Sequence, residues 1–270
     1  METTMNTLKE EIIRRIAAFP GNTSIFFKDL TSGESWGYHE EEPMRAASVI
    51  KLTVMAELFR AIEAGEVSRD QKILLKDEDR VPICGVLTLL HSGIELTPID
   101  LCWLMITISD NMATNLLINL LTPEKIQQNN LRLGLHGMVM NRRMFDQRPG
   151  YREKSNSVSA LGSAQLLEMI WKKQLVSREA SEEMLEMLLA QQCTNKMPLL
   201  LPGEGVAAHK TGEDDGVSHD VGIVLAKKPF IVCFVNHQLE EDTAGELNIL
   251  IGQITKELFD FQGGLPEQAD

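Results

Sequence analysis

A long helical stretch between two β-rich segments is the feature of this sequence that most limits its possible folds. Apolar residues recur with helical spacing from Ser48 to about Ala190, and few strand-like runs interrupt them. Helices are predicted over 48–64, 98–109, 112–121, 123–133, 160–173 and 178–190. Two stretches with proline and glycine, 65–97 and 134–158, separate these helices. Long ordered loops in compact domains are often functional, so both stretches are candidate functional loops.

Strand-like runs lie on both sides of the helical stretch. An amphipathic N-terminal helix is followed by a predicted hairpin over 22–30 and 34–38. Past Pro202-Gly203, strands are predicted at 205–211, 217–226 and 229–237, and a last amphipathic helix at about 244–261. The simplest arrangement joins both ends of the chain in one antiparallel sheet with flanking terminal helices. We therefore expect an α+β fold with a discontinuous α/β domain, 1–43 and 191–270, and an inserted all-α domain, 44–190.

The charge of the chain argues against two classes of partner. Its net charge is -13, and no block of lysine or arginine offers a surface for phosphates, so we expect neither nucleic acid nor a membrane as partner. A monomer is expected. The first residues have no apolar signal core, which predicts a cytoplasmic protein or a trimmed secreted or periplasmic form.

Cysteine and histidine spacing gives no sign of a metal site. Cys84, Cys102, Cys193 and Cys233 form no C-x-x-C pair and lie mostly in apolar surroundings, which favours buried thiols over disulfides. The six histidines include no H-x-x-x-H pair. We expect no metal and no cofactor.

The pattern Ser48-Val49-Ile50-Lys51 opens the first long helix. The lysine comes three positions after the serine, so the amine lies one turn on and should reach the hydroxyl. A lysine whose pKa is lowered by burial can serve as the base that activates a serine. Taken alone, a Ser-x-x-Lys pattern occurs by chance about once in a chain of this length, and a helix cap with a solvated lysine is the simpler explanation.

Two further polar patterns follow. Ser109-Asp110-Asn111 lies between two apolar helices, where Ser109 could shuttle a proton, Asn111 could bind an amide and Asp110 could brace the loop. His209-Lys210-Thr211-Gly212 ends a predicted strand, where a cation and a hydroxyl could hold a carboxylate. Each is also compatible with an ordinary cap or turn. All three in this order should occur by chance in about one chain in a thousand.

The three patterns together resemble the motif set of the class A β-lactamases, penicillin-recognising serine enzymes. The similarity extends to Arg45-Ala46-Ala47 before Ser48 and to the order of hairpin, helices and sheet, and it covers essentially the whole chain. This resemblance implies a five-stranded antiparallel sheet with terminal helices, an inserted all-α domain, and a catalytic cleft between them.

The resemblance also implies roles for individual residues. Ser48 would be the acylated nucleophile, Lys51 its proton acceptor or relay, and Ser109 the group that passes the proton to the β-lactam nitrogen. The binding residues would be Asn111 for the side-chain amide, Lys210 with Thr211 for the carboxylate, Gly212 for close approach of the ligand, and the backbone N–H groups of Ser48 and Glu213 as oxyanion hole.

The chain departs from the class A pattern at the loop that normally carries a glutamate. Met144 stands near the glutamate position, and a thioether cannot act as a base. Asp146 is the nearest carboxylate and Glu153 a more distant one, and each is more readily explained as a solvated loop charge. Acylation could proceed through Lys51, whereas hydrolysis of the acyl-enzyme should be slow.

A second departure concerns the arginine that often supports the substrate carboxylate in this family. His219 stands in its place, either as a partly charged substitute or as a histidine capped by Asp220. Three functions therefore stay open: a slow serine β-lactamase, a D-Ala-D-Ala carboxypeptidase or esterase acting on acyl-peptides or esters, and a non-catalytic penicillin-binding sensor.

Overall fold

The computed structural model describes residues 4–82, 84–146, 148, 154–240 and 243–266. Its centre is a five-stranded antiparallel sheet with the order β2-β1-β9-β8-β7. The strands are β1 (Asn22–Asp29), β2 (Ser35–Tyr38), β7 (Ala207–Asp214), β8 (Val217–Val224) and β9 (Phe230–His237). This sheet confirms the expected α+β fold. It leaves β7 as an edge strand, which later becomes one wall of the site.

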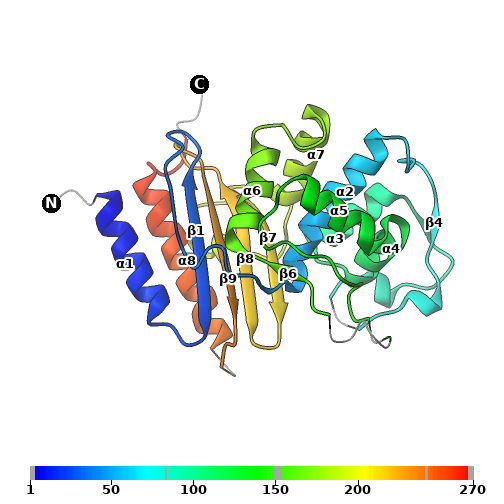
Figure 1. Ribbon diagram of the computed structural model, residues 1–270, viewed down its shortest axis with the longest axis horizontal. Coiled ribbons are helices and arrows are strands. Elements are labelled where there is room, and N and C mark those ends of the chain that lie inside the picture. The colour runs from blue at the N-terminus through cyan, green and yellow to red at the C-terminus, as the bar shows by residue number, and fades with distance from the viewer. Residues whose placement is uncertain (1–3, 83, 147, 149–153, 241–242, 267–270) are drawn as a thin grey trace.

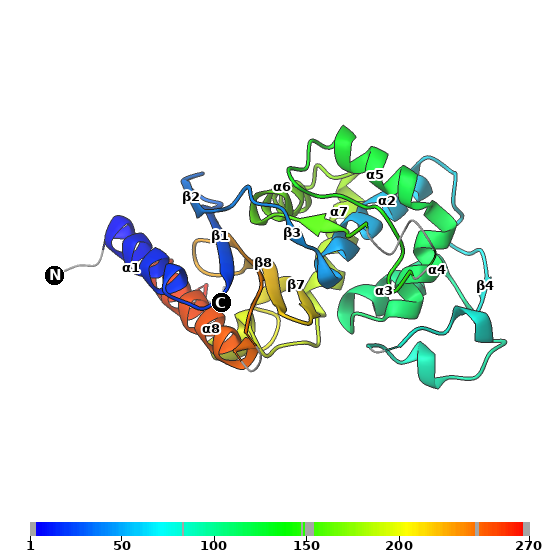
Figure 2. The same ribbon diagram turned by 60° about the horizontal axis from the view of Figure 1, so that its bottom comes forward.

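Two terminal helices, α1 (Met5–Ala17) and α8 (Ala244–Phe261), lie side by side on one face of the sheet (Figures 1 and 2). Strand residues alternate between the two faces. In β9, Phe230, Val232 and Phe234 belong to the hydrophobic cluster under these helices, and Ile231, Cys233 and Val235 belong to the cluster on the opposite face. A strand buried on both faces explains the continuous apolar run that the sequence shows there.

The helical part of the chain packs on the opposite face of the sheet and extends away from it (Figure 1). Its helices are α2 (Lys51–Glu63), α3 (Pro98–Thr107), α4 (Asn111–Leu121), α5 (Pro123–Arg132), α6 (Ala160–Trp171) and α7 (Arg178–Leu189). All six agree with the predicted ranges to within a few residues. In α2 only Arg60, Ile62 and Glu63 are not buried, so this helix is the core element of the helical part.

The connecting stretches contain short elements that the sequence did not predict. Within 65–97 lie β4 (Ile73–Leu74) and β5 (Glu95–Leu96), which pair with each other, and the 3-10 turns η2 (Asp77–Asp79) and η3 (Leu87–Leu89). The strands β3 (Met44–Arg45) and β6 (Ser157–Val158) form a second small pair. Two-residue strands are too short to leave a periodic pattern.

The cysteine prediction is only half right. All four cysteines are free, and Cys102 and Cys233 are buried as expected. Cys84 is exposed and Cys193 is partly exposed, because both lie in connecting segments rather than in packed helices or strands. In the part of the chain that the structure describes, no helix is long and apolar enough to cross a membrane.

Candidate active site

A cavity of about 720 Å³ lies where the edge strand β7 meets the helical part of the chain. Residues of all three sequence motifs, or of their immediate continuation, line it: Ser48, Asn111 and Glu213. Met144, from the loop that lacks the family glutamate, lines it as well. The fold therefore brings together segments that are far apart in the sequence.

Ser48 lies in the 3-10 turn η1 (Ala47–Ile50), which leads directly into α2. No side chain caps this turn, so Ser48 is not the simple helix cap that the pattern alone allowed. Ala47, immediately before it, has a φ of 41°, a left-handed conformation that is costly for a residue with a side chain. N–H groups in the first turn of a helix have no intrahelical acceptor, which leaves that of Ser48 available for an oxyanion.

The Lys51 amine is completely buried and points to the second motif. Its Nζ donates to the Ser109 carbonyl at 2.7 Å, to Ser109 Oγ at 3.0 Å and to Asn111 Oδ1 at 2.8 Å. We expected a contact with the Ser48 hydroxyl, but the structure records no such hydrogen bond. Burial, followed by the neighbouring Lys210 charge, holds the Lys51 pKa well below its ordinary value. An amine with a lowered pKa is suited to accept a proton.

Ser109 lies between two lysines. Its Oγ accepts from Lys51 Nζ and, at 3.1 Å, from Lys210 Nζ. Its φ of 59° places it in the left-handed region, directly before the first turn of α4. Asp110 caps that helix through Ala113 N at 3.0 Å and also accepts from Leu87 N at 2.9 Å. The acid therefore braces the loop, as expected, while the serine hydroxyl links the two amines.

The third motif lies inside a strand rather than at its end. β7 continues to Asp214, beyond Lys210-Thr211-Gly212, because the hairpin turns only at Asp215 and Gly216. Lys210 is fully buried, and burial lowers its pKa to about 8. It therefore carries a positive charge at neutral pH, next to the buried Thr211 hydroxyl.

The expected role of Gly212 was to let a ligand approach the backbone, but the structure gives a different reason for a glycine at this position. A side chain there would lie 3.0 Å from the His219 ring and 3.2 Å from Val49 Cγ2. The glycine is therefore required for packing of β7 against β8 and η1, and the space beside it is occupied by protein rather than by a ligand. β7 is an edge strand, so every second N–H group along it points away from β8 and has no partner in the sheet. An unpaired N–H group of this kind is what the oxyanion role expected for Glu213 requires.

His219 does not supply the expected positive charge. Its ring is fully buried, with Nε2 donating to the Arg45 carbonyl at 2.8 Å and Nδ1 accepting from Asn236 N at 3.1 Å. Burial lowers its pKa to about 3, so the ring is neutral. The alternative partner, Asp220, instead contacts His209 Nδ1 at 2.8 Å. Both expectations for His219 are wrong.

A buried lysine that sequence reasoning missed lies beside the third motif. Lys196 Nζ donates to the carbonyls of Gly212 at 3.3 Å and His219 at 3.1 Å, and it pairs with Glu213 at 3.0 Å. The residue precedes the 3-10 turn η4 (Met197–Leu200), and no pattern in the sequence distinguishes it from a surface lysine. Lys196 and Lys210, rather than His219, are the buried cations beside Gly212.

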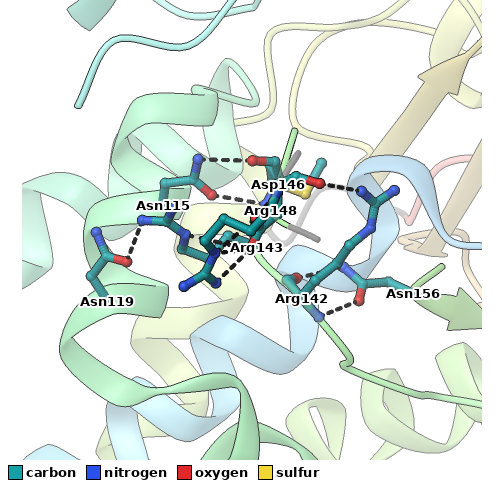
Figure 3. Close-up of polar contacts among 8 residues, drawn as sticks. Asn115, Asn119, Arg142, Arg143, Asp146, Arg148 and Asn156 are labelled. Atoms are coloured by element: carbon teal, nitrogen blue, oxygen red, sulfur yellow. Dashed lines mark hydrogen bonds and ion pairs between the residues drawn. The ribbon is translucent and has the colours of Figure 1, made fainter. Parts of the chain in front are cut away.

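Met144 is held in place by Asn115 of α4. The Asn115 side chain donates to the Met144 carbonyl at 3.0 Å and accepts from Met144 N at 2.9 Å (Figure 3). Asp146 does not line the cavity. Its carboxylate pairs with Arg148, whose hydrogen bonds lower the Asp146 pKa. Asp146 is thus bound by arginine and poorly placed to act as a base, while Glu153 lies outside the described residues.

Metal ligands do not gather anywhere in the described ranges. No group of three or more histidine, cysteine, aspartate or glutamate side chains there is arranged to hold an ion.

Comparisons with known proteins bear on the family and the fold of the chain. The profile of the Beta-lactamase enzyme family matches residues 7–262. A solved β-lactamase from Sphaerobacter thermophilus is 30% identical, with a TM-score of 0.87 over 98% of this chain and 100% of that one. PBP-A, at 24% identity, has a TM-score of 0.84 over 96% of this chain and 97% of its own, a likeness of fold.

Among curated sequences, a β-lactamase of Rhodobacter capsulatus is 29% identical over 128 residues, 47% of this chain and 43% of that protein. The β-lactamase CARB-4 of Pseudomonas aeruginosa is 30% identical over 41% of this chain and 38% of its own length. The matched stretches thus span less than half of each of these two relatives.

Proposed function

Because the chain belongs to the Beta-lactamase enzyme family, we propose that it is a serine hydrolase that opens β-lactam amides through an acyl-Ser48 intermediate. One observation carries the proposal. Lys51, Ser109 and Lys210 form a continuous buried chain of hydrogen bonds beside a cavity that Ser48 lines.

Acylation requires a proton to leave Ser48 and another to reach the substrate nitrogen. The lowered pKa of Lys51 favours its neutral form, which accepts the Ser48 proton in the substrate complex. The Ser48 oxygen bonds to the lactam carbon, and Ser109 gives its proton to the nitrogen as the C–N bond breaks. Ser109 recovers a proton from Lys51, which lies 3.0 Å away.

Substrate binding divides between charge and backbone. Lys210, still protonated at neutral pH, and the Thr211 hydroxyl receive the substrate carboxylate, with the Lys196 charge behind the strand. The N–H groups of Ser48 and Glu213 receive the oxyanion, and Asn111 receives the acyl amide. Donors of this kind typically contribute about 3–4 kcal/mol each to the transition state.

Release of the acyl group is the weak half of this cycle. Met144 lines the cavity together with Ser48, and Asp146, two residues further along the same loop, is bound by Arg148. Among proteins of this fold, a PBP-A mutant is known as an acyl-enzyme complex with penicillin G. We expect the same kind of adduct here, with slow hydrolysis.

The direct test is intact-mass measurement of the folded protein after incubation with benzylpenicillin. The expected result is a single adduct of the full penicillin mass that decays slowly, and that Ser48→Ala does not form. If folded wild-type protein shows neither adduct nor turnover, the proposal is wrong.

Replacement of Met144 tests the deacylation argument separately. Met144→Glu should accelerate loss of the adduct at least about tenfold, since a placed general base typically contributes a factor of about 100 or more. Met144→Gln is the matched control, because it has the same length without the base. Equal decay rates in the two variants would contradict the role assigned to this position.

A D-Ala-D-Ala carboxypeptidase or esterase is a second candidate, favoured by the same absence of a carboxylate at Met144. Steady turnover of a D-Ala-D-Ala peptide or a thioester, faster than turnover of benzylpenicillin, would establish it. An adduct that survives for hours with no turnover of either substrate class would instead indicate a penicillin-binding sensor.

A further inference from the structure

Two walls of the cavity around Ser48 carry opposite charges. The strand wall consists of Glu213, Asp214 and Asp215, at the end of β7 and in the following turn. The loop wall contains Arg142 and Arg143, on the segment that precedes Met144. In a chain of net charge -13, neighbouring arginines at the mouth of a cavity are notable. The two walls face a single cavity, so one ligand can contact both.

The strand wall keeps an excess negative charge. Lys196 pairs with Glu213 at 3.0 Å, and Arg45 lies 3.6 Å from the Asp214 carboxylate. Arg45 also donates to Asp215, but to its backbone carbonyl. Within the described residues no cation pairs with the Asp215 carboxylate. Three carboxylates face two cations here, and the exposed Asp215 side chain is the one left for an ammonium group of a ligand.

The loop wall keeps an excess positive charge. Arg142 donates to the Asp146 carbonyl at 2.9 Å, whereas the Asp146 carboxylate is bound by Arg148. Arg143 donates to Asn119 of α4 and lies 3.9 Å from the Asp146 carboxylate, and Figure 3 shows Arg142 on the other side of the loop. Among the residues that the structure describes, no carboxylate pairs with Arg142. Its planar guanidinium is therefore left to receive a carboxylate of a ligand.

The position of these walls relative to the reacting groups indicates which part of a substrate they contact. Glu213 provides the backbone donor proposed for the oxyanion and is itself the first residue of the strand wall. Asn111, which lines the same cavity, is the residue proposed for the acyl amide. The portion of the acyl group beyond that amide consequently lies between the strand wall and the loop wall.

We propose, building on the serine hydrolase function above, that the preferred acyl donors have a side chain that ends in a zwitterionic α-amino acid. Its carboxylate binds Arg142, and its ammonium group binds Asp215 with support from Asp214. A neutral side chain leaves both walls without partners, and a purely anionic one leaves the strand wall unpaired. The preference is thus for two opposite charges on one acyl chain.

Three penicillins with acyl chains of equal length test this preference. D-α-aminoadipoyl penicillin carries both charges, adipoyl penicillin only the carboxylate, and hexanoyl penicillin neither. Second-order rate constants for formation of the Ser48 adduct are measured by intact mass. We expect each added charge to raise the rate constant about three- to fivefold, the size of a partly exposed ion pair. The differences should shrink in concentrated salt.

Variants assign each charge to its wall. Asp215→Asn should bring the ratio of aminoadipoyl to adipoyl rate constants close to one. Arg142→Gln should do the same for the ratio of adipoyl to hexanoyl, and Arg142→Lys should retain most of that ratio because it keeps the charge. Asp70→Asn and Arg178→Gln, which alter the same residue types outside the cavity, should leave both ratios unchanged.

The outcomes separate this inference from the function on which it rests. Equal rate constants for the three penicillins, with clear adducts, would overturn the charge preference and leave the hydrolase intact. Failure of all three to form an adduct would overturn the hydrolase proposal and this inference with it. If the ratios of rate constants stay unchanged in Asp215→Asn and Arg142→Gln, these walls do not bind the charged groups of the acyl chain.

Discussion

At the scale of single residues, the chemistry depends on two buried lysines with different protonation requirements. Lys51 is useful as a base when neutral, and Lys210 is useful as an anion receptor when charged. Burial lowers the pKa of both, and the charge of Lys210 further lowers that of Lys51. The proximity of the two amines, bridged by Ser109 Oγ, thus favours the neutral form of Lys51 beside Lys210.

The pH dependence of acylation follows from this arrangement. The Lys210 pKa is lowered to about 8, so the receptor for the substrate carboxylate is charged below that pH and loses its charge above it. The second-order rate constant for adduct formation with benzylpenicillin should therefore fall as pH rises through about 8. Intact-mass time courses between pH 6 and 10 measure it.

Lys210→Arg is the control for this limb, because arginine stays protonated over the whole range. The variant should lose the decline near pH 8 even where its absolute rate constant is lower. A wild-type rate constant that stays constant up to pH 10 would contradict the assignment of Lys210 as carboxylate receptor.

The motifs in the sequence predicted which residues meet in the cavity better than they predicted individual contacts. Ser48, Asn111 and Glu213 do line one cavity. Their positions relative to the ends of helices and strands can be recognised from the neighbouring residues in the sequence. The direction of the Lys51 amine, the neutral state of His219 and the whole role of Lys196 depend on packing between distant segments. Such contacts leave no pattern along the chain.

At the scale of elements, α2 carries a buried charge that needs its partner. The Glu57 side chain is only 1% exposed and receives two hydrogen bonds from Arg60, at 2.7 and 2.8 Å. Arg60→Ala would leave a buried, unpaired carboxylate, which typically costs about 3 kcal/mol or more. We expect the free energy of unfolding in urea to fall by about 3 kcal/mol.

Two further variants make this prediction specific. Arg60→Lys keeps the charge without the planar fork, so its loss should be smaller than that of Arg60→Ala. Arg14→Ala removes an arginine from an exposed pair with Glu11 and should leave the unfolding midpoint unchanged. A loss for Arg60→Ala no greater than for Arg14→Ala would show that Glu57 does not depend on this partner.

Helices and long strands were predictable, whereas the small elements that shape the cavity were not. The six helices of 51–189 have ten or more residues each, enough for a helical period to show. The strand pair β3 and β6 has two residues on each side, and one of them, Arg45, supports the strand wall. β7 also runs past Gly212 to Asp214. The sequence did not predict this end of the strand, because glycine and polar residues there are typical of a turn.

At the scale of the whole molecule, the sheet separates two hydrophobic clusters. The four cysteines differ in how far solvent can reach them on the helical side of the sheet. Cys102 and Cys233 are buried in the cluster on the helical side, and burial raises the pKa of both thiols. Cys84 is exposed and lines the cavity with Ser48. The exposure of each thiol in the folded protein should therefore decide the order in which the cysteines react.

A thiol-disulfide reagent such as an aromatic disulfide should modify the folded protein at Cys84 first, at the partly exposed Cys193 more slowly, and at Cys102 and Cys233 only after denaturation. Buried thiols react through opening of the structure, so their rates should be lower by a factor of about 100 or more. Because Cys84 shares the cavity with Ser48, the bulky adduct should also slow acylation, and Cys84→Ser should remove both effects. Rapid modification of Cys102 or Cys233 in the folded protein would contradict the closed packing of the helical side, and unimpaired acylation of the Cys84 adduct would place that thiol outside the path of the substrate.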